Sequence, residues 1–330
     1  MGIKDSSKRR DTITFIVKWF LLFLIVAVGL GFGLAQPLFF KSANLLEVLR
    51  SSVNLSIMAA GLCFVFSVGE IDFAAGAEMS LAAVVIGKIM DIPAFENLYV
   101  VAVILTLIIM ALVGFINSIL VVRVRIPAFI ATLGMSTMLS GICKYFTKGG
   151  SFISQNWPKA FTEIGQRYSF GVIPNPVWVL IGGALLAYFV LDKTRFGRYI
   201  YAVGQNPTAS AHVGINVNKM KTWGFMCCSM FIGVAGIVMC STLRLVSPTM
   251  GSDSMLGSIS ALMLGATFLR PGEFNIAGCV LGGVLLAIIS NGLIMVNASF
   301  WTKDVVQAGI LIISVGFVSY LGQGVKVKLL

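Results

Sequence analysis

Four acidic residues lie beside apolar segments, where an ionised side chain is costly. Glu70, Asp72 and Glu78 stand between two apolar runs, and Glu273 has a matching place later in the chain. Transfer of a carboxylate into hydrocarbon costs roughly 2.5 kcal/mol or more, so each must face water, a partner or a cavity. Two interpretations stay open: solvated turn residues at a membrane edge, or residues that line or gate a path, for example at the start of a half-helix.

Amide side chains extend this set. Asn117 and Asn291 lie inside apolar runs, where hydrogen bonds between helices are favoured over contacts with a solute. Asn275 stands near Glu273 at the position that corresponds to Asp72. The predicted pathway or gate residues are Glu70, Asp72, Glu78, Asn117, Glu273, Asn275 and Asn291.

Signatures of enzymes and metal sites are missing. The chain has one histidine, His212, which argues against histidine triads, zinc sites and an intramembrane enzyme. It lacks GxxxxGK[ST], GxSxG and GxGxxG, so ATP must be bound by another polypeptide if ATP is used. The cysteines show no CxxC spacing and are predicted to be buried core residues: Cys63, Cys143, Cys227, Cys228, Cys240 and Cys279.

The composition of the chain indicates which structural elements carry these polar residues. Hydrophobic residues make up 58% of the chain and charged residues 11%. Long apolar runs recur near the ~20 residues that cross a ~30 Å hydrocarbon core. We therefore predict an all-α polytopic membrane protein, with a retained first span rather than a signal peptide. The ten predicted spans are 14–36, 53–69, 73–90, 98–121, 126–146, 176–191, 222–245, 255–269, 275–296 and 303–321, and residues 37–50 suit an amphipathic interfacial helix.

The basic residues predict the orientation. With a cytoplasmic N-terminus, ten crossings place 15 of the 24 Lys and Arg residues inside, as the positive-inside rule requires. The net charge of +11 then reflects helix ends rather than nucleic-acid binding. We expect a basic cytoplasmic tail (1–13), a single transmembrane domain (14–322) and a cytoplasmic tail (323–330).

Two loops are long enough to meet partners. Residues 192–221 form the only long interior segment rich in charge, and in it Gly204 and Gly214 bracket the helix-compatible run PTASAHV. We predict that this cytoplasmic loop meets a soluble partner. On the outer side, the aromatic residues of 147–175 are either interfacial anchors or part of a docking surface.

One internal similarity indicates a repeat. Residues 69–76 read GEIDFAAG and residues 272–278 read GEFNIAG, at a constant offset. Each copy follows an apolar stretch and precedes one rich in Gly and Ala, a common plan in transporters. The span count places both copies on the cytoplasmic side, which suits a parallel repeat. Re-entrant half-helices would change the number of crossings between the copies, so the symmetry of the repeat stays open.

At this point the chain resembles a known family over roughly residues 36–322. The segments are SVGEIDFAAGAEMSLAA (67–83), RIPAFIATLGM (125–135), TRFGRYIYAVGQNPTASAHVGINVNKMK (194–221) and residues 261–283. They resemble the permease subunits of bacterial sugar-type ABC importers, the ribose, galactose and xylose branch that includes autoinducer-2 permeases. The third segment is the most specific, because its order of residues has no generic membrane explanation.

The resemblance implies a permease in the bacterial inner membrane for a sugar or sugar-like small molecule. Its partners would be a second permease, ABC ATPase subunits that hold ATP and Mg²⁺, an extracytoplasmic sugar-binding protein and membrane lipid. This chain would bind no cofactor, metal or nucleic acid. In this resemblance, the residues that match the ATPase-coupling segment are Gly204, Asn206, Ala209 and Gly214. Ser210 and His212 lie in the same segment.

Two departures from the family pattern add bulk or charge. Glu70 replaces a small residue, and Ala266, Arg270 and Pro271 stand in a stretch that is glycine-rich in relatives. We hypothesise a heterodimer with a more typical permease, and a homodimer stays open. The alternative function is an ion-coupled secondary transporter or channel, which the clustering of acids at span ends argues against.

Overall fold

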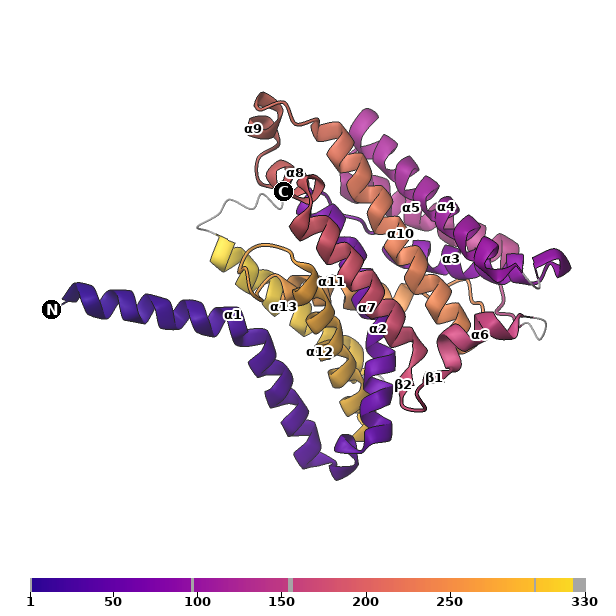
Figure 1. Cartoon of the computed structure of the whole chain (residues 1–330), viewed down its shortest axis with the longest axis horizontal. Coiled ribbons are helices and arrows are strands. Elements are labelled where there is room, and N and C mark those ends of the chain that lie inside the picture. Colours follow the sequence, from indigo (N-terminus) through magenta and orange to yellow (C-terminus); the bar gives the residue numbers. More distant parts are fainter. Residues whose placement is uncertain (1, 96–97, 154–156, 300, 323–330) are drawn as a thin grey trace.

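The computed structural model describes residues 2–95, 98–153, 157–299 and 301–322, and these fold almost entirely as helices (Figure 1). The predicted tail 323–330 lies outside the described residues. A short antiparallel pair, β1 (Tyr168–Ser169) and β2 (Ile173–Pro174), interrupts the helical structure.

Each of the ten predicted apolar segments contains a helix. Among the described residues, five helices are long and apolar enough to cross a membrane. They are α2, α10 and α12, together with α4 and α7, each of which is extended by a π-helical turn. The chain is therefore a multi-pass helical membrane protein, and ten crossings stay a prediction. The helices are α1 (Gly2–Ala35), α2 (Ser42–Ser67), α3 (Ala75–Met90), α4 (Tyr99–Ser118), α5 (Ala128–Thr147), α7 (Asn175–Tyr188), α10 (Val217–Leu243), α11 (Ser252–Gly265), α12 (Ile276–Met295) and α13 (Thr302–Gly322).

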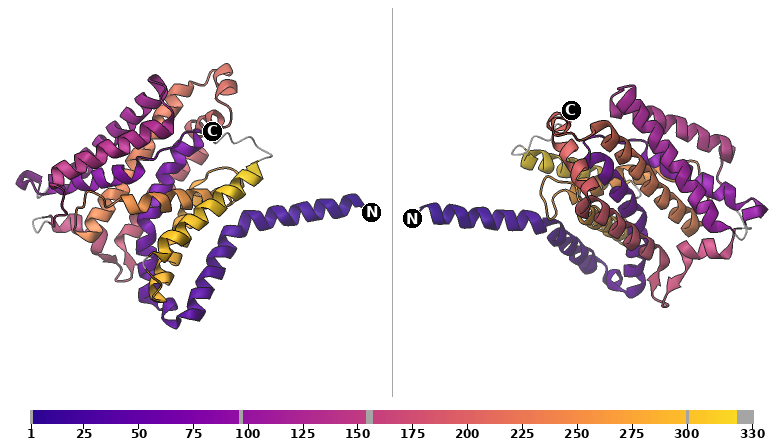
Figure 2. Two further views of the ribbon diagram at one scale, coloured as in Figure 1. Left: turned by 180° about the vertical axis from the view of Figure 1, so that it is seen from behind. Right: turned by 45° about the horizontal axis from the view of Figure 1, so that its top comes forward.

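The connecting elements gather at two ends of the bundle. One end, here the α9 end, carries the short helices α8 (Arg195–Gln205) and α9 (Pro207–His212). The opposite end, here the α6 end, carries α6 (Lys159–Gln166) and the β1–β2 pair (Figure 1). α13 runs back toward the α9 end (Figure 2).

The N-terminal region differs from the predicted boundaries. Residues 37–50 are not a separate interfacial helix: a 3₁₀ turn (Pro37–Phe40) leads into α2, which runs without interruption from Ser42 to Ser67. That prediction was wrong because no glycine or proline separates the amphipathic stretch from the apolar one before Gly61. α1 begins at Gly2, and its first part points away from the bundle (Figure 1).

α11 is a buried half-helix. The link that precedes it runs along α3, because Val246 packs beside Gly87 and Gly251 packs beside Gly76. α11 therefore begins beside the start of α3; it has only 14 residues, of which 257–265 are buried. An extended link followed by a short helix takes the place of one continuous span.

The core is built around α2, whose apolar window is 72% buried, against 28% for α4 and 22% for α7. Small residues let its neighbours approach closely. A Cβ at Gly278 would collide with the carbonyl oxygen of Gly265, and one at Gly236 would lie 2.5 Å from that of Met79. Glycine at these two positions therefore allows close helix contacts. All six cysteines are free; five are buried and Cys227 is half-buried.

Candidate functional site

The predicted coupling segment folds as a protruding helix. Asn206 caps α9, since its Oδ1 accepts a hydrogen bond from the Ala209 N–H at 2.9 Å, and Pro207 occupies the first turn. Ala209 and His212 are exposed, whereas Ser210 is 5% exposed. α9 thus presents a small, polar surface at the tip of the molecule (Figure 1).

α8 holds this helix against the bundle. Gly204 lies so close to α2 that a Cβ would collide with the Ser67 carbonyl oxygen. The Tyr201 hydroxyl donates a hydrogen bond to the carbonyl oxygen of Phe274 at 2.8 Å. Burial raises the pKa of Tyr201 well above its usual value, so the phenol stays a neutral donor. Gly204 and Ser210 therefore position α9, while Asn206, Ala209, His212 and Gly214 are the exposed members of the predicted set.

Two ion pairs attach the ends of the 192–221 segment to the bundle. Lys221 pairs with Glu70, and Arg270 pairs with Asp192 at 3.0 Å. Glu70 and Arg270 are the charges that depart from the family pattern, and each is neutralised within this chain.

The two copies of the repeat share two local features, a glycine with positive φ and a polar side chain that accepts a backbone hydrogen bond. Gly69 and Gly272 adopt φ values of +84° and +89°, which favour glycine. Asp72 Oδ1 accepts from the Ala74 N–H and Asn275 Oδ1 accepts from the Gly278 N–H, both at 2.8 Å, at the starts of α3 and α12.

Both repeat turns also lie at the α9 end. A Cβ at Gly69 would lie 3.4 Å from the Cα of Gly204 in α8, and Gln205 reaches Glu273 at 3.5 Å. α8 and α9 are consequently linked to the turns that precede two helices.

A second polar cluster lies inside the bundle. Glu78 of α3 is fully buried, and its Oε1 accepts hydrogen bonds from Asn117 Nδ2 at 2.9 Å and Ser229 Oγ at 3.0 Å. Glu78 Oε2 and Asn117 Oδ1 have no hydrogen-bond partner among the described residues. This cluster joins α3, α4 and α10 in the interior.

The structure therefore divides the predicted pathway residues. Glu70 and Glu273 contact the segment that carries α8 and α9, whereas Glu78 and Asn117 pair inside the bundle. Asp72, in the turn before α3, is fully buried, and burial raises its pKa to about 6.

The two remaining asparagines, Asn275 and Asn291, differ in their hydrogen-bond partners. Asn275 caps α12 and donates to the carbonyl oxygen of Phe268 at 2.9 Å. Asn291 lies in α12, and its Oδ1 has no partner in the described part of the chain.

Several residues that form these contacts could not be predicted as site residues from the sequence. Ser229 is a single hydroxyl in an apolar helix, and Asp192, Tyr201 and Lys221 were ordinary members of a polar loop. Their partners lie 70 or more residues away, so only the fold reveals them.

Two aromatic residues of the α6 end are core residues. Trp157 is 5% exposed and donates from Nε1 to Asp91 Oδ1 at 3.1 Å, and Phe161 is fully buried against it. Neither fits an interfacial anchor or a docking surface. Tyr168 is 40% exposed and Phe170, at the tip of the β1–β2 turn, is 89% exposed.

The structure is thus a multi-pass bundle of membrane helices that projects a capped polar helix from one end. The profile of one family, described as the permease component of branched-chain amino acid transport systems, matches residues 44–315. The chain belongs to this permease family.

Curated relatives agree with this assignment. The ribose import permease protein RbsC of Escherichia coli (strain K12) is 33% identical over 301 residues, which are 89% of this chain and 91% of the relative. The protein of the same name from Haemophilus influenzae is 31% identical, covering 91% and 92%. The autoinducer 2 import system permease protein LsrC of Klebsiella pneumoniae is 30% identical, covering 89% and 83%.

Proposed function

We propose that the chain is the permease subunit of an ATP-driven, binding-protein-dependent importer for a sugar or sugar-like small molecule. The names of its relatives, which include ribose and autoinducer 2 import permeases, support this substrate class. The chain would lie in the bacterial cytoplasmic membrane with the α9 end and both termini in the cytoplasm. This orientation rests on the positive-inside rule and on ten crossings.

One observation carries the proposal: the exposed helix α9 is linked to the starts of two interior helices. Through α8 it touches the turn before α3 at Gly69 and the turn before α12 at Glu273. The start of α3 in turn packs against Gly251, where α11 begins. A push on α9 by an ATPase would thus move α3, α11 and α12 together, which is the coupling that alternating access requires.

The remaining proposed partners are assigned to the α9 end and the α6 end of the bundle. ATP and Mg²⁺ would be held by the ATPase at the α9 end, and the extracytoplasmic binding protein would dock at the α6 end. A second permease would complete the path. Because Glu70 and Arg270 are paired within this chain, a homodimer accounts for them as well as a heterodimer does. Purification with the neighbouring subunits decides between these, since two copies of this chain without a second permease exclude the heterodimer.

The decisive experiment is ATP-coupled uptake in proteoliposomes with the partner ATPase and binding protein. Ala209→Asp places a charge on the exposed face of α9 and should abolish stimulated ATP hydrolysis and uptake, while Ala209→Ser should retain both. The Asp variant must still purify as a folded permease without its ATPase. Uptake that persists without ATP would favour the ion-coupled carrier instead.

A further inference from the structure

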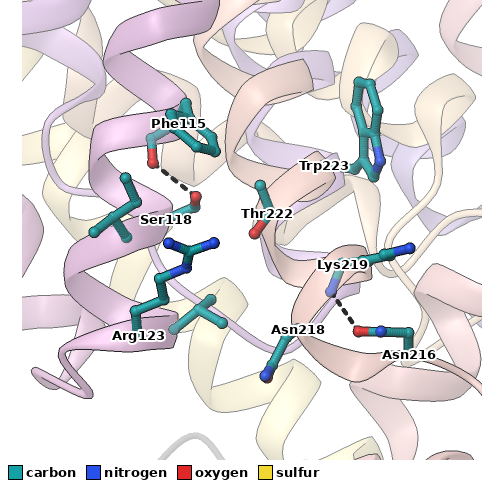
Figure 3. A pocket seen from close by; sticks show the side chains of 10 residues that line it. Phe115, Ser118, Arg123, Asn216, Asn218, Lys219, Thr222 and Trp223 are labelled. Atoms are coloured by element: carbon teal, nitrogen blue, oxygen red, sulfur yellow. Dashed lines mark hydrogen bonds between the residues drawn. The ribbon is translucent and has the colours of Figure 1, made fainter.

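A polar cavity of about 340 Å³ opens at the α9 end between α4 and α10. Its walls come from the π-helical turn Ile119–Arg123, which extends α4, and from the first turns of α10. We call it the α4–α10 pocket; Figure 3 shows the side chains around it. None of the predicted pathway residues and no residue of α9 lines it.

The pocket is basic and rich in hydrogen-bond donors. Arg123 and Lys219 line it together with Asn218 and Thr222, and no acidic residue does. In Figure 3 the guanidinium of Arg123 points into the space between the helices, toward Thr222, while the Lys219 amine is turned outward at the rim. Arg123 forms no ion pair or side-chain hydrogen bond with any residue that the structure describes.

This donor set matches a phosphate group. A guanidinium offers a planar fork of N–H donors that pairs with two oxygens of a phosphate, and it stays charged at any physiological pH. The hydroxyl of Thr222 and the amide of Asn218 can donate to further oxygens. Arg123 inside the pocket and Lys219 at its rim, with no acidic residue in the lining, favour a ligand with net negative charge.

The surroundings indicate that the phosphate belongs to a lipid. Ile104, Ile108, Leu112 and Phe115 follow one another at helical spacing on α4, and their exposed fractions are between 38% and 55%. This apolar stripe leads along α4 to the pocket, which Phe115 lines. Trp223, 48% exposed, stands at its edge, where an amphipathic ring suits the membrane interface.

We propose that the α4–α10 pocket binds the phosphate headgroup of an anionic phospholipid, whose acyl chains lie along the exposed stripe of α4. Basic pockets between helices at the cytoplasmic side suit such headgroups. The site stands independently of the transport function. Asn216, which caps α10 through the Lys219 N–H at 3.0 Å, lines the same pocket. A bound headgroup would therefore steady the junction between α9 and α10.

The test is thermal unfolding of the delipidated full-length protein in neutral detergent, titrated separately with phosphatidylglycerol, phosphatidylcholine and inorganic phosphate. Phosphatidylglycerol should raise the unfolding midpoint at lower concentration than phosphatidylcholine. Arg123→Gln should weaken the phosphatidylglycerol response about fivefold, the loss expected for one basic contact with an anionic headgroup. Arg125→Gln is the matched control, because Arg125 is exposed two residues away and does not line the pocket.

The other outcomes are equally decisive. An unchanged phosphatidylglycerol response in Arg123→Gln would overturn the proposal. An equal response to inorganic phosphate would overturn the lipid assignment and identify a soluble anion as the ligand. Should Arg123→Gln fail to fold, Thr222→Val removes a donor without removing a charge, and it should weaken the same response while leaving the phosphatidylcholine response unchanged.

Discussion

Removing the ion pair between Lys221 and Glu70 should both destabilise the fold and loosen the coupling segment. The two side chains are 23% and 14% exposed, so water screens them only in part. Opposite charges at 4 Å and an effective dielectric constant of 20 attract by about 4 kcal/mol, and desolvation offsets much of this. Hydrogen bonds to charged groups contribute about 1.5–3 kcal/mol net, which is the coupling energy we expect for this pair.

A double-mutant cycle measures that energy directly. The free energy of unfolding in mixed detergent would be determined for the wild type, Lys221→Met, Glu70→Gln and the double variant. The pair of Arg270 with Asp192 is the internal control, because its arginine is 54% exposed and should contribute below about 1 kcal/mol. Single effects that simply add in the double variant would refute the reasoning, as would an equal coupling energy for the control pair.

Three further predictions concern buried positions, each measured as a change in unfolding free energy or midpoint. Asn117→Leu, which takes a donor from buried Glu78, should cost about 1–3 kcal/mol, whereas Glu78→Gln should be tolerated because its amide can donate to Asn117; equal losses would contradict this. Gly278→Ala forces a methyl group against a carbonyl oxygen of α11 and should cost about 1–3 kcal/mol, while Gly134→Ala, with open space around it, should be neutral or stabilising. Asp72 has a folded-state pKa raised from 3.8 to about 6, so native stability falls as pH rises through that interval; Asp72→Asn, which keeps the acceptor, should exceed the wild type above pH 6 and lose that advantage near pH 4.

Helix positions and the protruding segment could be predicted from local sequence. An apolar run long enough to cross hydrocarbon folds as a helix wherever it lies, since its backbone polar groups must be satisfied internally. The helix α9 was foreseeable for a similar reason, because Asn206, Pro207 and Gly214 are start and stop signals within a few residues. The repeat was visible because the same turn needs the same residue types, with glycine at 69 and 272.

Long-range partners could not be predicted in this way. In the sequence, Glu70 and Arg270 appeared only as departures from the family pattern that add bulk or charge. The structure shows that each forms an ion pair with a residue at one end of the 192–221 segment. Trp157 resembled an interfacial anchor until its burial against α3 and α6 became visible. α11 resembled an ordinary span, although it has only 14 residues and begins beside the start of α3.

The sequence by itself determined that this chain is a bundle of membrane helices with a polar helix projecting from one end. Composition, apolar run length and capping residues act over a few turns of chain, so they can be read without the fold. Only the tertiary structure decided which charges neutralise each other and that Glu78 meets Asn117 and Ser229. It also decided that Arg123 lines an open pocket with no partner among the described residues. Those contacts depend on how helices far apart in the chain pack, and packing is set by shape and glycine contacts across the whole bundle.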